Sequence, residues 1–186
     1  MQYECYLESL IKAAEECTFN TKDIELKGYE CILDKLVGIF SEYKLNKEKR
    51  VFFIGNGGSA AIAVHMTADF LRNGGMTTID MYDPAIITCL GNDYGYEYVF
   101  SKQLEMHIKS GDLLVAVSSS GNSENIIRAI GIAIERGAHV MTFTGFNPDN
   151  KARQKGDYNL YVPSTEYGIV ESVHNMILQQ IVDSIK

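Results

Sequence analysis

The stretch Asp112–Ser123 reads D-L-L-V-A-V-S-S-S-G-N-S and decides how the rest of the chain is interpreted. Its apolar run, Leu113–Val117, has the length of a buried strand, and apolar residues at helical spacing follow from Ile126 onward. The small-residue turn between these segments carries four hydroxyl groups, on Ser118, Ser119, Ser120 and Ser123. The pattern therefore predicts a strand that ends in a hydroxyl-rich turn and leads directly into a helix.

Such a turn is suited to hold an anion. The first N–H groups of a helix have no partner inside the helix, and the positive end of the helix dipole lies behind them. Serine hydroxyls add further donors without bulk, while Gly121 lets the backbone approach a ligand closely. The favoured interpretation is a phosphate site, and the alternative is a turn whose serines only cap the helix.

The composition indicates one soluble globular domain over residues 1–186. Hydrophobic residues make up 46% and charged residues 22% of the chain, which is typical of a packed core. The net charge of −7 argues against nucleic acid or acidic membranes as partners, so a phosphorylated ligand requires local donors. The sequence has no apparent signal peptide, transmembrane run or C-x-x-C pair. We therefore expect a cytoplasmic protein with reduced thiols.

Alternating strand and helix patterns predict an α/β fold. Residues 1–45 are expected to form two helices joined by a connection over 18–27, and residues 46–186 an α/β sandwich. Five strands are expected in the sandwich, at residues 51–54, 76–79, 113–117, 139–143 and 158–162. Together they form a doubly wound parallel sheet in three layers, of flavodoxin-like or Rossmann-like type. Ligands of such sheets bind beyond the carboxyl ends of the strands, where the turns 55–59 and 118–123 are expected.

Four motifs in register resemble the sugar isomerase (SIS) domain family, and most closely its phosphoheptose isomerase branch. They are G-N-G-G-S at 55–59, His65 with an acid at 69, C-L-G-N-D-Y-G at 89–95 and S-S-S-G-N-S at 118–123. The resemblance implies the SIS fold with an N-terminal helical pair, a homotetramer with active sites at subunit contacts, and zinc binding. It also implies the isomerisation of sedoheptulose 7-phosphate to a heptose 7-phosphate, which feeds heptose synthesis.

The resemblance further assigns roles to individual residues. The phosphate is expected on Ser118, Ser119, Ser120 and Ser123. The sugar is expected to contact Asn56, Gly57, Gly58, Ser59, Asn92, Asp93 and Gln179, although Asp93 is also an ordinary turn residue. The metal-site positions of the family fall on His65, Asp69, Glu171 and Gln179. The candidate catalytic residues are Asp69, Glu171 and His174.

Several of these positions depart from the residues that are usual in the branch. Asp69 replaces a glutamate that serves as base and metal ligand, Glu171 replaces a glutamine, and Gln179 replaces the second catalytic histidine. Ile169 stands where an arginine is usual. Asp69 is still a carboxylate and can act as a base, although it is one methylene shorter. An amide at position 179 cannot exchange a proton near pH 7 and so cannot replace histidine as an acid.

Two arrangements of the remaining acidic groups stay open. His65 and Asp69 lie four residues apart on one helical face, and Glu171 would complete three ligands with an open position for zinc. Alternatively, Asp69 and Glu171 form a metal-free acid–base pair in which proximity raises the pKa of one carboxyl group. His174, three residues after Glu171, is either the missing acid or a packing histidine.

Three functions are consistent with these residues. The first is a sugar-phosphate isomerase that works through an enediol-type proton transfer. The second is a non-catalytic phosphosugar-binding or protein-interaction module, favoured by the missing histidine at 179 and disfavoured by the carboxylates at 69 and 171. The third is a dinucleotide enzyme, because Gly55-x-Gly57-x-x-Ala60 follows a strand and Asp80 ends the next one. A second phosphate turn at 118–123 argues against this third function, so we expect no nucleotide cofactor.

Overall fold

Seven strands form one sheet in the computed structural model, which describes residues 3–186. Five of them are parallel, and their spatial order is β4(Thr77–Ile79), β3(Arg50–Ile54), β5(Leu113–Ser118), β6(His139–Thr144) and β7(Tyr158–Tyr161). Numbered along the chain, these five have the order 2-1-3-4-5, which is that of flavodoxin-like doubly wound folds. The predicted doubly wound parallel sheet is confirmed.

Two further strands extend the sheet where the sequence suggested only a connection. β1(Thr18–Asn20) pairs antiparallel with β7, and β2(Glu25–Lys27) pairs antiparallel with β1. The expectation of a plain link over 18–27 is therefore wrong, and the sheet has a mixed edge. Three-residue strands are too short to show a hydrophobic period, and the backbone edge of β7 supplies the pairing that orders them. Phe19 at the centre of β1 is fully buried.

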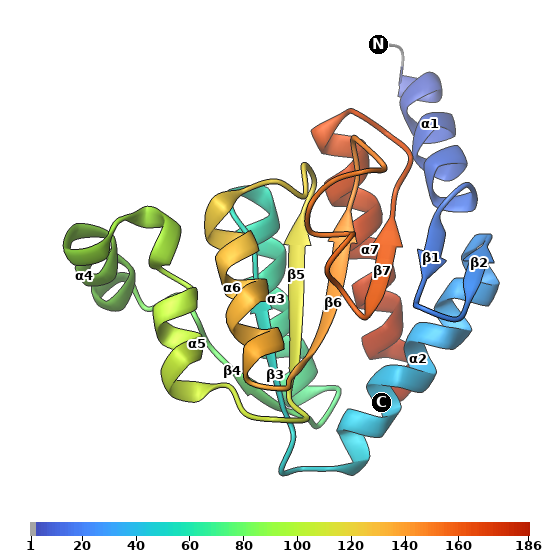
Figure 1. Ribbon diagram of the computed structural model, residues 1–186. Helices are drawn as coiled ribbons and strands as arrows, with labels where there is room; N and C mark the ends of the chain where they lie inside the picture. The colour runs from blue at the N-terminus through green and yellow to red at the C-terminus, as the bar shows by residue number, and fades with distance from the viewer. Residues whose placement is uncertain (1–2) are drawn as a thin grey trace.

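Helices cover both faces of the sheet (Figure 1). One face carries α1(Tyr3–Glu15), α2(Tyr29–Leu45), α3(Gly58–Arg72) and α7(Tyr167–Ile185). The other carries α5(Ser101–His107) and α6(Glu124–Glu135), with α4(Pro84–Tyr94) and a short 3-10 turn, Tyr96–Tyr98, projecting beyond them. The predicted N-terminal helical pair, α1 and α2, packs on α7. Within residues 3–186, no helix is both long and apolar enough to cross a membrane.

Residues of the central strands alternate between two hydrophobic cores. Val51 and Phe53 of β3 face the core under α3 and α7, whereas Phe52 and Ile54 face the core under α5 and α6. Successive side chains of a strand point to opposite faces, so a sheet covered on both sides needs apolar residues at every position. This requirement explains the uninterrupted apolar runs that mark the strands in the sequence.

The topology brings the two glycine- and serine-containing turns together. The chain goes from β3 to β4 on one side and then to β5 on the other, so the strand order reverses between β3 and β5. Crevices open at such reversal points, beyond the carboxyl ends of the strands. The turn 55–59 follows β3 and the turn 118–123 follows β5, and both contribute to one cavity there.

The serine turn also depends on the loop that follows β6. Gly121 has a φ of +62°, and a Cβ at this position would lie 2.0 Å from the Oδ1 atom of Asn150. Asn150 is buried, and its Oδ1 accepts a hydrogen bond from the Arg153 N–H at 3.0 Å. The Gly121 carbonyl accepts another from the Ala152 N–H at 2.9 Å. The close approach of these two loops therefore requires glycine at position 121.

Replacing Gly121 with alanine is expected to destabilise the fold by about 1–3 kcal/mol, because its positive φ disfavours a side chain and the new methyl group meets Asn150. The matched control is Gly131→Ala in α6, where no described atom lies within 4 Å of an added Cβ. There alanine is expected to stabilise the helix by about 0.5–1 kcal/mol. Urea denaturation measures both changes, and effects of the same sign would contradict this account.

Candidate functional site

A small cavity of about 110 Å³ lies where the two turns meet. Its walls come from the turn after β3, the serine turn after β5 and the beginning of α7. The lining residues are Asn56, Ser59, Ser118, Ser119, Ser120, Ser123, Tyr167 and Glu171. The structure thus brings together the four predicted phosphate-binding serines, two of the predicted sugar-binding residues and one predicted catalytic carboxylate.

The four serines divide into two that stabilise the turn and two whose hydroxyls make no hydrogen bond within residues 3–186. Ser118 Oγ accepts a hydrogen bond from the Gly121 N–H at 3.2 Å, and Ser120 Oγ accepts one from the Asn122 N–H at 3.3 Å. Ser119 Oγ is buried with no hydrogen-bond partner in the described chain, and Ser123 at the start of α6 makes no side-chain capping bond there.

These two unpartnered hydroxyls separate the two interpretations of the serine turn. A buried polar atom without a hydrogen bond is unfavourable, so it is usually satisfied by a ligand or by water. If the serines only capped α6, the Ser123 side chain would bond to the first helical N–H groups. The hydroxyls of Ser119 and Ser123 instead stay available at the N-terminus of α6, which favours the anion site.

The carboxylate of Glu171 reaches this cavity from α7 and packs on the backbone of α3. A Cβ on Gly58 would lie 2.3 Å from Glu171 Oε2, so the two helices meet here at very short range. Burial raises the pKa of Glu171, and a hydrogen bond from the Ser59 backbone partly offsets this shift. A carboxylate at the start of α3 also repels a pyrophosphate, which argues against a dinucleotide site.

A second polar cluster lies farther along α3 and α7. The Gln179 side chain donates from Nε2 to Asp69 Oδ2 at 2.9 Å, and its Oε1 lies 3.2 Å from His65 Nε2. Asn73 Nδ2 donates to the other Asp69 oxygen at 3.0 Å. Both oxygens of Asp69 are therefore engaged by amide donors, and Asp69 does not line the serine cavity.

Within the described chain, the metal arrangement implied by the resemblance is assembled only in part. No group of three or more His, Cys, Asp or Glu side chains in residues 3–186 is placed to hold a metal ion. Glu171 precedes Gln179 by roughly two helical turns, about 12 Å along the axis, and it faces the serines instead of His65 and Asp69. The other three predicted metal-site residues, His65, Asp69 and Gln179, lie together. The zinc site therefore stays a prediction, and we derive no metal-assisted step.

The alternative arrangement, a coupled pair of Asp69 and Glu171, is not seen. The pKa of Glu171 is raised by burial, and the second carboxylate does not contribute to the shift. Asp69 is instead bonded to Gln179. The two carboxylates therefore belong to different clusters on the same pair of helices.

His174 belongs to the core and not to the cavity. It is fully buried, its Nε2 lies 3.2 Å from the Thr144 carbonyl oxygen, and its ring packs edge-on against Phe143 with centroids 5.7 Å apart. Burial lowers the pKa of His174 to about 4, so the ring is neutral near pH 7. These surroundings favour the packing role over the role of catalytic acid.

Asn92 and Asp93 lie on α4 and are not among the cavity-lining residues. Both are exposed, and Asn92 Nδ2 donates to Asp93 Oδ1 at 2.8 Å. Asp93 belongs to the last turn of a helix, so its interpretation as a free turn residue is wrong. Gly57, the residue before α3, is exposed beside the cavity with a φ of +56°.

Three residues near the cavity were missed by sequence reasoning: Tyr96, Asn125 and Tyr167. Asn125 and Asn56 exchange two side-chain hydrogen bonds of 2.9 Å, and the Tyr96 hydroxyl donates to Asn56 Oδ1 at 2.9 Å. Tyr96 therefore helps to hold the Asn56 side chain in place. Polar side chains next to the two turns were the available signal, but spacing alone does not tell which of them face the cavity.

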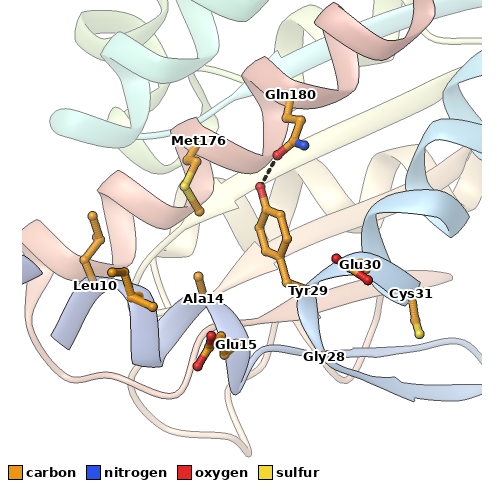
Figure 2. A pocket seen from close by; sticks show the side chains of 10 residues that line it. Leu10, Ala14, Glu15, Gly28, Tyr29, Glu30, Cys31, Met176 and Gln180 are labelled. Atoms are coloured by element: carbon orange, nitrogen blue, oxygen red, sulfur yellow. Dashed lines mark hydrogen bonds between the residues drawn. The ribbon is translucent and has the colours of Figure 1, made fainter. Parts of the chain in front are cut away.

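A larger hollow, of about 680 Å³, lies between α1, the beginning of α2 and α7 (Figure 2). Leu10, Ala14 and Met176 line it, and the Tyr29 hydroxyl is hydrogen-bonded to Gln180 at its edge. Its walls are mostly apolar and include none of the predicted site residues. The candidate site is therefore the small cavity at the strand ends, which contains predicted site residues although it is the smaller of the two.

Comparison with known proteins agrees with this geometry. The model of the SIS domain matches residues 34–145. The chain belongs to the SIS domain family. The phosphoheptose isomerase of Fusobacterium nucleatum is 33% identical and is aligned over 99% of this chain and 91% of its own length. That of Aneurinibacillus thermoaerophilus is 34% identical over 92% of this chain and 89% of its own length.

Solved structures place this SIS domain in the same branch. The phosphoheptose isomerase of Neisseria gonorrhoeae has a TM-score of 0.82 at 30% identity, covering 98% of this chain and 97% of its own. That of Francisella tularensis has a TM-score of 0.83 at 27% identity, covering 100% and 98%. Vibrio vulnificus NanR, solved with ManNAc-6P, shares the fold alone, with a TM-score of 0.66 at 18% identity over 98% of this chain and 60% of its own. The resemblance to phosphoheptose isomerases is confirmed.

Replacing Ser123 with alanine is expected to change the free energy of unfolding by less than about 0.5 kcal/mol, because its side chain makes no capping bond in the described chain. Asp83→Ala is the matched control, since Asp83 Oδ1 caps α4 by accepting from the Ala85 and Ile86 N–H groups at 2.9 and 3.0 Å. Its loss is expected to cost about 1 kcal/mol. If denaturation shows that both substitutions lower the free energy of unfolding equally, Ser123 acts as a simple cap.

His174 is expected to make stability fall in acid. Its pKa is about 4 in the fold against an ordinary 6.5, so the unfolded chain binds the extra proton between these values. The free energy of unfolding should therefore decline as the pH is lowered from 6.5 to 4, by up to about 3 kcal/mol. Denaturation at several pH values should show that the free energy of unfolding declines less in His174→Leu than in the original protein. In His107→Gln, a control at an exposed position, it should decline as much as in the original protein. Identical profiles in both variants would refute this role.

Proposed function

We propose that this SIS domain is an aldose–ketose isomerase that converts sedoheptulose 7-phosphate to a heptose 7-phosphate. The observation that carries the proposal is the pairing, in one cavity, of the unpartnered hydroxyls of Ser119 and Ser123 with the carboxylate of Glu171. The serine turn at the N-terminus of α6 binds the phosphate, and the sugar extends from it toward Glu171. The relatives named as phosphoheptose isomerases support the same activity.

Glu171 is the residue that we infer to transfer the proton. Ketose–aldose interconversion requires a base that takes a proton from the carbon beside the carbonyl and returns it to the adjacent carbon through an enediol. A carboxylate performs this transfer best when its pKa is shifted toward the working pH, and burial raises the pKa of Glu171 in that direction. Glu171 also lines the cavity that holds the free serine hydroxyls.

Asp69 has a positioning role in this proposal. Its oxygens accept hydrogen bonds from Gln179 and Asn73, so no lone carboxylate oxygen is directed at the serine cavity. Through Gln179, Asp69 is linked to His65 and holds α3 against α7. Removing its charge should therefore affect the reaction less than removing that of Glu171.

A homotetramer is the assembly that we propose. The cavity of about 110 Å³ is smaller than the roughly 300 Å³ of the smallest common ligand sites, so a neighbouring subunit is expected to complete it. Leu7 and Ile11 of α1, 58% and 50% exposed, supply apolar surface for such a contact. Four free cysteines support the proposed cytoplasmic location.

One observation favours the alternative of a phosphosugar-binding module without catalysis. Gln179 stands where the branch usually has a histidine, and its amide is bonded to Asp69. An amide cannot donate or accept a proton during turnover. The alternative therefore predicts that sugar phosphates bind without any exchange of protons with the solvent.

Isotope wash-in distinguishes the two functions. The full-length protein with sedoheptulose 7-phosphate in deuterium oxide is expected to incorporate deuterium beside the carbonyl group, as followed by NMR. Glu171→Gln keeps the shape of the side chain and is expected to slow exchange by about 100-fold or more, because the base is lost. Asp69→Asn is the comparison and is expected to slow exchange by less than about tenfold, since this change only disturbs the positioning of neighbouring groups.

Three outcomes of this experiment would overturn parts of the proposal. Thermal stabilisation by the sugar phosphate without deuterium incorporation in the original protein would favour the binding module. Undiminished exchange in Glu171→Gln would remove Glu171 from the proton transfer. A greater loss in Asp69→Asn than in Glu171→Gln would assign the base to Asp69.

A further inference from the structure

Tyr167 lines the serine cavity but takes no part in the proposed phosphate binding or proton transfer. It is the first residue of α7 and lies one helical turn before Glu171, so both side chains project from the same face of the helix. Tyr167 is 61% exposed, so its ring stands open at the cavity and is not part of the core. A tyrosine in this situation offers an apolar ring face and a hydroxyl group, which together suit the carbon chain of a sugar.

Phe146 supports the Tyr167 ring from the loop that follows β6. The two rings meet edge to face, with centroids 4.7 Å apart and planes inclined by 75°. This is the favoured geometry of an aromatic pair, because the positive edge of one ring meets the negative face of the other. The contact restricts the orientation of Tyr167 even though most of its surface is exposed.

The backbone of Phe146 is held in an unfavourable conformation. Its φ is +57°, and among residues 3–186 it is the sole non-glycine residue with a positive φ. A bulky residue adopts this conformation only where its surroundings impose it, and such positions gather at functional sites. Here the Phe146 N–H donates to the Ser164 carbonyl at 2.9 Å, and the Tyr161 hydroxyl donates to the Phe146 carbonyl at 2.9 Å.

The same segment is connected to the serine turn. The Gly145 N–H donates to the Ser119 carbonyl at 2.9 Å. Ser119 carries the buried hydroxyl that has no partner in the described chain. The strained residue, the aromatic pair and the serine turn are therefore held together around one cavity.

We propose that Tyr167 is a specificity-determining residue that contacts the carbon chain of the bound sugar phosphate, and that Phe146 positions it. The ring face packs against the C–H groups of the sugar while the serine turn holds the phosphate. This inference rests on the proposed function and names the part of the site that recognises the sugar. It implies that Tyr167 distinguishes a sugar phosphate from inorganic phosphate.

Calorimetric titration of the full-length protein with sedoheptulose 7-phosphate and with inorganic phosphate tests the contact. Tyr167→Ala is expected to weaken binding of the sugar phosphate by about tenfold and of inorganic phosphate by less than about twofold. In steady-state kinetics the same variant should raise KM by about tenfold with a much smaller change in kcat, because the contact exists before and during the reaction. Equal weakening of both ligands, or no weakening, in a folded Tyr167→Ala protein would overturn the inference.

Variants of Phe146 test the positioning role. Phe146→Gly removes the ring and suits the positive φ, so the protein should stay folded and show a rise in KM that approaches that of Tyr167→Ala. Phe146→Tyr keeps the ring and should leave KM near its original value. The double variant Phe146→Gly, Tyr167→Ala should have a KM no higher than that of Tyr167→Ala, since both changes remove the same contact. Additive losses, or an unchanged KM in Phe146→Gly, would refute the positioning role.

The binding measurements separate this inference from the proposed isomerase activity. If the original protein binds the sugar phosphate without isotope exchange, the isomerase proposal fails while the ratio of the two affinities still tests Tyr167. If exchange occurs but Tyr167→Ala leaves that ratio unchanged, the inference about Tyr167 fails and the isomerase proposal stands.

Discussion

The parallel pairing of β3 with β5 is the constraint on which the whole site depends. The pairing runs from Val51 beside Leu113 to Ile54 beside Ala116, so the two strands end close together at one edge of the sheet. Burial of apolar side chains on both faces of these strands holds the pair in place. Because α3 and α6 cover opposite faces, the turns that lead into them leave a crevice between them.

The polar groups around this crevice are divided between two clusters on α3 and α7. In the first, Glu171 shares a cavity with the serine hydroxyls, and burial raises its pKa. In the second, Gln179 bridges Asp69 and His65 through hydrogen bonds. An amide at position 179 stabilises the Asp69 carboxylate without supplying a proton. The Glu171 carboxylate thus remains at the cavity, whereas the Asp69 carboxylate is held by hydrogen bonds between α3 and α7.

The fold by itself does not decide between an isomerase and a binding module. The SIS architecture recurs in proteins of low identity to this chain, and function depends on the side chains at the crevice. The distinguishing features here are the unpartnered hydroxyl of Ser119 and the carboxylate of Glu171, which line the same small cavity. Each feature depends on how segments that are far apart in the sequence pack against one another.

Much of the candidate site could be predicted because its signals are local. The turns 55–59 and 118–123 each follow an apolar run of strand length, and the topology of doubly wound sheets sets them at one edge. What could not be predicted depends on how α7 is rotated and placed against α3. The sequence offered Asp69, Glu171 and His174 as catalytic candidates, yet Asp69 is bonded to Gln179, Glu171 faces the serines and His174 is in the core.

The sequence alone therefore determined the five parallel strands, their helices and the serine turn, since hydrophobic period and turn residues act over a few neighbouring positions. Only the tertiary structure decided that the 18–27 segment adds two strands beside β7, that Glu171 and not Asp69 reaches the cavity, and that Tyr167 forms its wall. The physical reason is that these features depend on which surfaces are left open once the core has packed. That outcome is set by contacts among distant segments and not by any local pattern of residues.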